Sequence, residues 1–169
     1  MLKFYAYAGG DPVEYVDPLG LVTTVVITYD GGIGSHAALY TSNGDEGKNP
    51  FIYDPAGSYD PESGTGDYID GTKANLNSYI SYQTSSWSAV KTFSFNTTPK
   101  IEQALSERAL NQGRALPGYC SRFVSAVLDG VGPFKDLGSF LWPGRLGNAL
   151  SKIPGVTIGS YDAGNPKRP

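Results

Sequence analysis

The sequence predicts one α+β domain, in which a small antiparallel sheet packs against helices. Two observations indicate this class. Short runs rich in β-branched and aromatic residues, separated by turn residues, dominate the first half of the chain. Apolar positions at intervals of three and four residues appear in the second half. With 169 residues, 40% of them hydrophobic and 17% charged, the chain is long enough to bury a core.

Four strands are predicted in chain order. Residues 22–29 are dense in β-branched side chains and end at the glycine-rich turn 31–34. The runs 36–41 and 51–54 follow, and the loop between them allows a hairpin. Residues 88–95 alternate apolar and polar side chains, which is typical of a half-buried strand.

Two helices are predicted after these strands. Thr98 is placed as a cap with Pro99 at the first helical position, so a helix over 99–112 follows. The next helix begins at Cys120, because apolar residues recur from there at helical spacing as far as Val131.

Other segments are less determined by their patterns. Residues 76–82 suit either a helix or a strand. Residues 58–71 are rich in Gly, Ser, Asp and Tyr without an apolar period, which favours an exposed loop. Residues 146–153 are expected to form a short helix, and the tail after Tyr161 to fray.

Cys120 and His36 are the chain's only cysteine and histidine. A thiol in the first turn of a helix lies where free backbone amides and the helix dipole favour an anion, which lowers its pKa. The same amides can donate to an acyl oxyanion, an interaction worth about 3 kcal/mol per donor. The two residues are therefore the minimum set for a cysteine nucleophile with a general base. The alternative is that both are structural, because free cysteines are often simply buried.

Composition weighs against several other kinds of site. One cysteine and one histidine are too few for a structural zinc site, and no cofactor is expected. The net charge of −3 gives no overall basic footprint for nucleic acid. The acidic residues between positions 60 and 70 miss the spacing of a calcium loop. The first residues lack the pattern of a secretory signal, so export is expected to depend on another segment or machine.

The N-terminal segment carries a motif of fixed spacing. Pro12, four residues, and then the run Asp17-Pro18-Leu19-Gly20-Leu21 resemble the end of the core of Rhs (YD-repeat) proteins, where a large shell joins a variable C-terminal toxin. The resemblance implies that residues 1–21 end the core and that cleavage after Leu21 releases residues 22–169 as the toxin domain. On composition alone, the segment suits an edge strand and a linker.

A second resemblance covers residues 36–131. The run Cys120-Ser121-Arg122-Phe123-Val124 resembles the Cys-Ser-Gly-Phe-Val helix start of the NlpC/P60 branch of the papain-like superfamily, with Arg122 in place of the usual glycine. The run from Ser35 to Tyr40, with the later strand 51–54, is similar to that family's histidine strand and its neighbour. The histidine precedes the cysteine, as in circularly permuted members and in the lecithin-retinol acyltransferase-like group.

The second resemblance implies a papain-like fold and assigns roles to four residues. Cys120 is the nucleophile, His36 is the base, and Asp54 orients the imidazole ring. Tyr119 adds a hydroxyl near the oxyanion. Two of these residues have plainer interpretations, since Asp54 also fits a turn carboxylate before Pro55 and Tyr119 a packing aromatic.

Together these features predict an antibacterial effector that is a papain-like thiol hydrolase of the peptidase, amidase or deamidase type. Its expected partners are the Rhs shell and secretion machinery before release, a cognate immunity protein, and a target-cell protein or peptidoglycan as substrate. Nucleic acid is not expected as a partner. Delivery is expected into the cytoplasm or the periplasm of a target bacterium. The alternatives are an acyltransferase or lipid hydrolase, a non-catalytic toxin that binds a target or a membrane, and a nuclease.

Overall fold

The computed structural model describes residues 20–42, 50–59, 68–85 and 87–164. Six strands form one antiparallel sheet in the order β4-β3-β2-β1-β5-β6. The strands are β1 (Val22–Asp30), β2 (Ile33–Thr41), β3 (Phe51–Tyr53), β4 (Tyr68–Asp70), β5 (Ala89–Asn96) and β6 (Thr157–Tyr161). The helices are η3 (Gly71–Lys73), α2 (Leu76–Ser85), α3 (Pro99–Gln112), α4 (Cys120–Leu128), η4 (Gly132–Phe134) and α5 (Pro143–Leu150). The predicted α+β class is confirmed.

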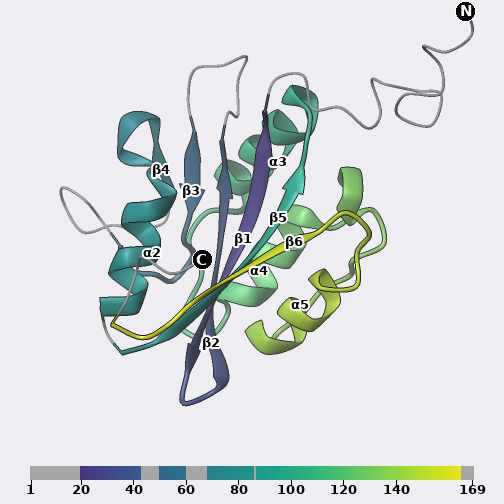
Figure 1. Cartoon of the computed structure of the whole chain (residues 1–169). Coiled ribbons are helices and arrows are strands. Elements are labelled where there is room, and N and C mark those ends of the chain that lie inside the picture. The colour runs from purple at the N-terminus through teal and green to yellow at the C-terminus, as the bar shows by residue number, and fades with distance from the viewer. Residues whose placement is uncertain (1–19, 43–49, 60–67, 86, 165–169) are drawn as a thin grey trace, which may run out of the picture.

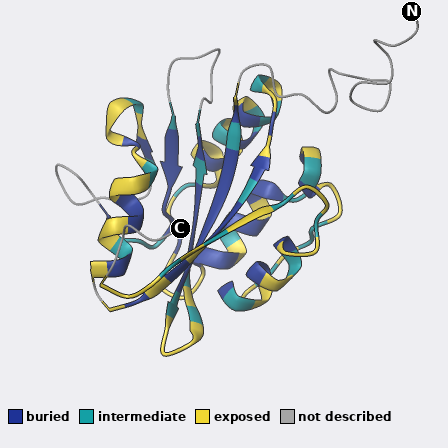
Figure 2. Cartoon of the chain, viewed as in Figure 1, coloured by how far each residue is buried: buried dark blue, intermediate teal, exposed yellow. Residues whose placement is uncertain are grey.

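The described elements form three layers. Helix α2 covers one face of the sheet, and α3, α4 and α5 cover the other (Figure 1). On β1, Val25 and Ile27 belong to the core beneath α3 to α5, whereas Val26 belongs to the core beneath α2. Both faces of β1 are therefore buried, and the strand lies in the dark blue centre of Figure 2. A continuous β-branched run is what a strand buried on both faces requires.

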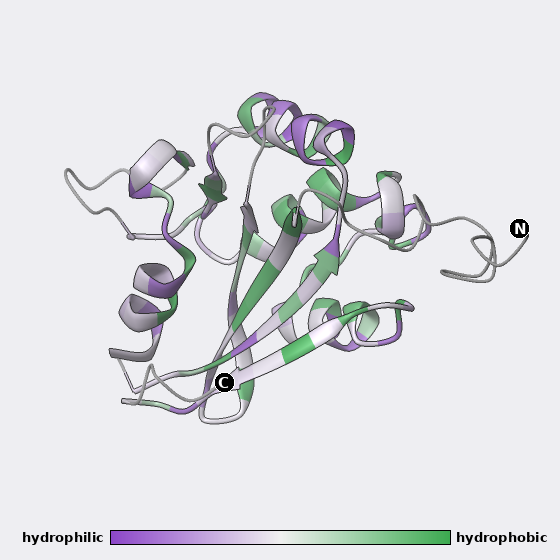
Figure 3. Cartoon of the chain, turned by 45° about the horizontal axis from the view of Figure 1, so that its top comes forward, coloured by the Kyte–Doolittle hydropathy of each residue, from purple (hydrophilic) through white to green (hydrophobic). Residues whose placement is uncertain are grey.

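The helices carry one apolar face each. On α3, Leu105 and Ala109 are buried four residues apart, as expected for one face of a helix. Hydrophilic and hydrophobic residues alternate around this helix in Figure 3. The cap is the one predicted from sequence: the hydroxyl oxygen of Thr98 accepts from the Ile101 N–H, and Pro99 follows. Among the described residues, no helix is both long and apolar enough to cross a membrane.

Several element predictions need correction. The ambiguous segment 76–82 lies within helix α2. The segment 58–71 is not wholly an exposed loop, because Tyr59 and Ile69 are buried and residues 68–70 form β4; residues 60–67 lie outside the described part. Strand β2 begins at Ile33, within the run predicted as a turn. Edge strand β6 was not predicted, since it is largely exposed and contains a glycine.

Helix α5 packs closely on strand β2 at a point where the backbones of Gly144 and Gly34 approach each other. A Cβ at Gly34 would lie 2.3 Å from the backbone nitrogen of Gly144, whereas a Cβ at Gly144 comes no closer than 3.7 Å to Gly34. We therefore expect Gly34→Ala to lower the free energy of unfolding by about 1 to 3 kcal/mol, because the clash involves backbone and cannot be relieved by a rotamer. Gly144→Ala is the matched control, and is expected to be neutral or to stabilise by up to about 1 kcal/mol. Urea unfolding of both variants measures the difference, and equal losses would contradict this account.

Candidate active site

The site lies at an open edge of the sheet. Strand β3 has only three residues and pairs with Leu39, Tyr40 and Thr41 of β2. Among the described residues, the earlier part of β2 has no strand on that side. Helix α4 begins there, and the Ala37 backbone N–H donates to the sulfur of Cys120 instead of to a neighbouring strand. The short strand therefore leaves room for the helix to reach His36.

A β-bulge sets the direction of the histidine. In the β1–β2 ladder Thr28 pairs with His36 and Tyr29 with Gly34, so Ser35 is the extra residue. The hydroxyl of Ser35 donates to the Thr28 carbonyl at 3.3 Å. Bulges commonly re-aim a side chain beside a functional site. The His36 side chain is 18% exposed here, whereas Ala37 and Ala38 after it are buried.

Asp54 holds the far side of the imidazole. Its Oδ1 lies 2.5 Å from His36 Nε2, and its side chain is fully buried. A tight turn follows, in which the Gly57 N–H donates to the Asp54 carbonyl at 2.9 Å and Ala56 adopts a φ of 61°. Since Nε2 is taken by Asp54, the other ring nitrogen is left for the thiol. This is the geometry of an orienting carboxylate.

The thiol and the imidazole perturb each other's proton affinity. Burial raises the pKa of the Cys120 thiol, but hydrogen bonding and charge from His36 and backbone N–H donors at Ala37 and Ser121 outweigh it, so the pKa is lowered overall. Burial likewise lowers the pKa of His36, but Asp54 and Cys120 raise it to about 10. The ordinary order of the two values is therefore inverted, and the proton resides on the imidazole.

A buried relay behind Asp54 was missed by the sequence analysis. The Tyr79 hydroxyl donates to Asp54 Oδ1 at 2.8 Å, and Gln83 Nε2 donates to that hydroxyl at 2.8 Å. Thr28 then donates to Gln83 Oε1 at 3.2 Å. Burial and the charge of Asp54 raise the pKa of Tyr79 well above its ordinary value, so it stays a donor. Tyr79 and Gln83 are four residues apart on α2. This spacing indicates that the two side chains are neighbours only once residues 76–85 are assigned to a helix.

Helix α4 begins with amides that have no partner inside the helix. The Phe123 N–H is bonded to the Tyr119 carbonyl, so the amides of Cys120, Ser121 and Arg122 precede the helical ladder, and that of Ser121 donates to the Cys120 sulfur. Such amides are suited to hold an oxyanion. Tyr119 is the residue before the helix and is 43% exposed, so its auxiliary role stays a prediction.

Of the two residues at the predicted processing junction, Asp17 and Leu21, only Leu21 lies in the described part of the chain. Asp17 lies outside the described residues. Leu21 is 2% exposed, and its carbonyl accepts from the Thr97 N–H at 3.1 Å. On the other side of the peptide bond, the Val22 N–H donates to the Ser42 hydroxyl at 2.7 Å. The Leu21–Val22 bond is therefore anchored on both sides and belongs to the folded domain.

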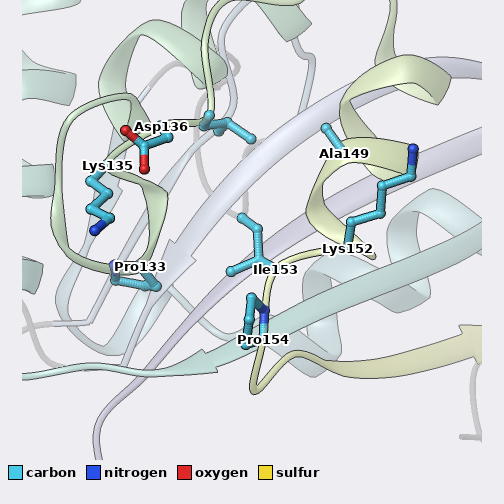
Figure 4. Close-up of a pocket in the computed structure, with 8 residues that line it drawn as sticks. Pro133, Lys135, Asp136, Ala149, Lys152, Ile153 and Pro154 are labelled. Atoms are coloured by element: carbon cyan, nitrogen blue, oxygen red, sulfur yellow. The ribbon is translucent and has the colours of Figure 1, made fainter.

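Two of the surface depressions formed by the described residues have volumes of about 300 Å³. The first borders His36 on the side of the sheet that α2 covers, and its other polar lining residues are Thr28, Asp30, Ser35, Ser58, Tyr82, Gln83 and Ser88. The second lies between η4 and α5, and its lining includes none of Cys120, His36 and Asp54; Lys152 lies across it from Lys135 and Asp136 (Figure 4). Among the described residues, no group of three or more His, Cys, Asp or Glu side chains is arranged so that it could hold a metal ion.

The turn after Asp54 provides a test of whether this carboxylate supports His36 and Cys120. A Cβ at Gly57 would lie 1.9 Å from Asp54 Oδ2. Gly57→Ala is therefore expected to displace the carboxylate and to reduce the rate of Cys120 alkylation at neutral pH by about tenfold, the factor that one unit of pKa gives. The matched control is Ala56→Gly in the same turn, which relieves a positive φ and keeps the carboxylate in place. Iodoacetamide kinetics compare the two, and an equal effect of both variants would contradict the role of Asp54.

No family model matches the chain, and no curated protein and no solved structure shows significant similarity to it.

Proposed function

We propose that the domain is a thiol hydrolase of papain-like type that works through an acyl-enzyme intermediate. The observation that carries the proposal is that three elements bring a thiol, an imidazole and a carboxylate together, so that their charges interact. A cysteine at the start of α4 meets a histidine on β2, and a carboxylate after β3 holds the ring. A cysteine and a histidine that are merely packed do not need inverted proton affinities or a third oriented group.

In the proposed reaction, the Cys120 thiolate attacks the carbonyl carbon of an amide or thioester. Amides at the start of α4 stabilise the oxyanion, and the imidazolium of His36 gives its proton to the leaving group. Water then adds to the acyl-enzyme as His36 takes one of its protons, and the thiolate is regenerated. Asp54 and Tyr79 keep the ring oriented throughout.

We further propose the biological setting that the N-terminal motif indicates. In it the domain is the toxin of an Rhs-type effector, delivered into a target bacterium and neutralised in its producer by an immunity protein. Because Leu21 is buried and bonded to Thr97, cleavage after Leu21 requires that the start of β1 be unpaired. Processing is therefore assigned to a stage before β1 docks.

Acyl-enzyme trapping tests the reaction. The chain is mixed with a peptide amide, a glutamine-containing protein and an acyl thioester in turn, quenched in acid, and analysed by intact mass and peptide mapping. We expect the acyl group of at least one class on Cys120. His36→Gln is the control and should suppress the adduct. Failure of all three classes to acylate a folded chain would contradict the hydrolase.

A further inference from the structure

The pocket beside His36 has a distinct charge. Asp30 is a carboxylate in its lining, and no lysine or arginine is found among the described residues that form it. The Ser88 hydroxyl donates to Asp30 Oδ1. Asp30 is an exposed residue, and hydrogen bonds from Ser35 and Ser88 lower the pKa of its carboxyl by more than desolvation raises it, while the charge of His36 lowers it further. Asp30 is therefore ionised at neutral pH.

The neighbouring triad adds to this negative field. In its ion-paired form, one imidazolium stands between one thiolate and one carboxylate, so the triad carries a net negative charge. Asp30 and His36 line the same pocket. A concave surface with charges of one sign concentrates ligands of the opposite sign.

The rest of the lining suits the same kind of ligand. Tyr82 is 38% exposed, and its hydroxyl lies 2.6 Å from the Ser58 hydroxyl. An aromatic face attracts a cation, and hydroxyl oxygens accept hydrogen bonds from an ammonium or guanidinium group.

We propose that this pocket binds a cationic group of the substrate, so that the enzyme selects acyl compounds with a primary ammonium or guanidinium group close to the scissile bond. The proposal rests on the hydrolase function, since it makes the pocket part of the same site. Asp30 is the residue that determines the preference. A carboxylate at the same substrate position is disfavoured, because it would face Asp30 and the triad.

Direct binding tests the preference without turnover. The N-methylamides of N-acetyl-lysine, N-acetyl-norleucine and N-acetyl-glutamate are titrated into the full chain, and Kd is measured by NMR shift changes. We expect the lysine compound to bind about tenfold more tightly than the norleucine compound, whose side chain has the same four carbons without the terminal ammonium group. Added salt should shrink that ratio, because it screens the attraction.

Two variants decide the assignment. Asp30→Asn keeps the hydrogen-bonding shape and is expected to bring the lysine-to-norleucine ratio below about twofold. Asp136→Asn removes an exposed carboxylate from the other pocket and should leave the ratio unchanged (Figure 4). Equal affinity for lysine and norleucine, absence of binding, or a ratio that survives Asp30→Asn would each overturn the proposal. Because no hydrolysis is measured, these results are separate from those of acyl-enzyme trapping.

Discussion

Cys120→Ala is expected to abolish the toxicity of the domain when it is expressed in bacteria without an immunity protein. Removing the nucleophile of a catalytic triad lowers kcat by about a millionfold, because no other group forms the covalent intermediate. The small core cost of the change cannot account for such a loss, since the thiol is only one heavy atom of a buried side chain. Growth of cells that express the variant should match the empty vector.

The control for this prediction is folded protein of unchanged abundance. Leu116→Ala removes a side chain that is 73% exposed near the start of α4, and should keep full toxicity. Expression with and without a periplasmic signal shows in which compartment the wild-type chain acts. If Cys120→Ala and His36→Ala both stay fully toxic while folded, the domain works by binding and the hydrolase proposal is wrong.

Cys120 and His36, the pair proposed to carry the reaction, could be singled out from sequence because the elements that hold them are locally encoded. The strand pattern of residues 36–41 and the helical period that starts at Cys120 place His36 and Cys120 on definite elements, β2 and α4, and each of the two residue types occurs once in the chain. Their approach was not encoded locally. It depends on β3 ending after three residues, so that α4 reaches a stretch of β2 that pairs with β1 on one side and with no described strand on the other. Strand length at an edge is a property of the packed sheet.

The supporting residues were harder to predict for a related reason. Tyr79 and Gln83 lie on a helix whose sequence, Leu-Asn-Ser-Tyr-Ile-Ser-Tyr-Gln-Thr-Ser, contains β-branched and hydroxyl side chains of low helix propensity. Packing of Tyr79 and Ile80 against the sheet stabilises that helix. Asp54 was placed at a strand end by its sequence, but the choice between turn carboxylate and orienting group needed the imidazole beside it.

The same arrangement makes the site one electrostatic unit. Asp54 accepts from Tyr79 and His36 at a single oxygen, and α4 presents the thiol to the opposite side of the ring. A change at any member therefore alters the proton affinity of the others. That coupling gives a measurement that needs no substrate.

The pH dependence of Cys120 alkylation is expected to depend on His36. In the wild type the pKa of the thiol is lowered, so the thiolate persists below the ordinary value of about 8.5 and is lost only as the pH falls through the lowered value. In His36→Gln the charge is gone, while burial still raises the pKa of the thiol. The midpoint of the iodoacetamide rate should therefore move to about 8.5 or above.

At high pH, the rate of turnover on any acylating substrate should change with pH in a different way from the rate of alkylation. Alkylation needs only the thiolate, so its rate stays level as the pH rises. Hydrolysis also needs the proton on His36, whose pKa is about 10, so kcat/KM should fall as the pH rises through that value. For the midpoint of the iodoacetamide rate, the unfolded chain serves as the control, and its Cys120 thiol should titrate at about 8.5. A wild-type alkylation midpoint equal to that of His36→Gln would show that the thiol and the imidazole do not form an ion pair.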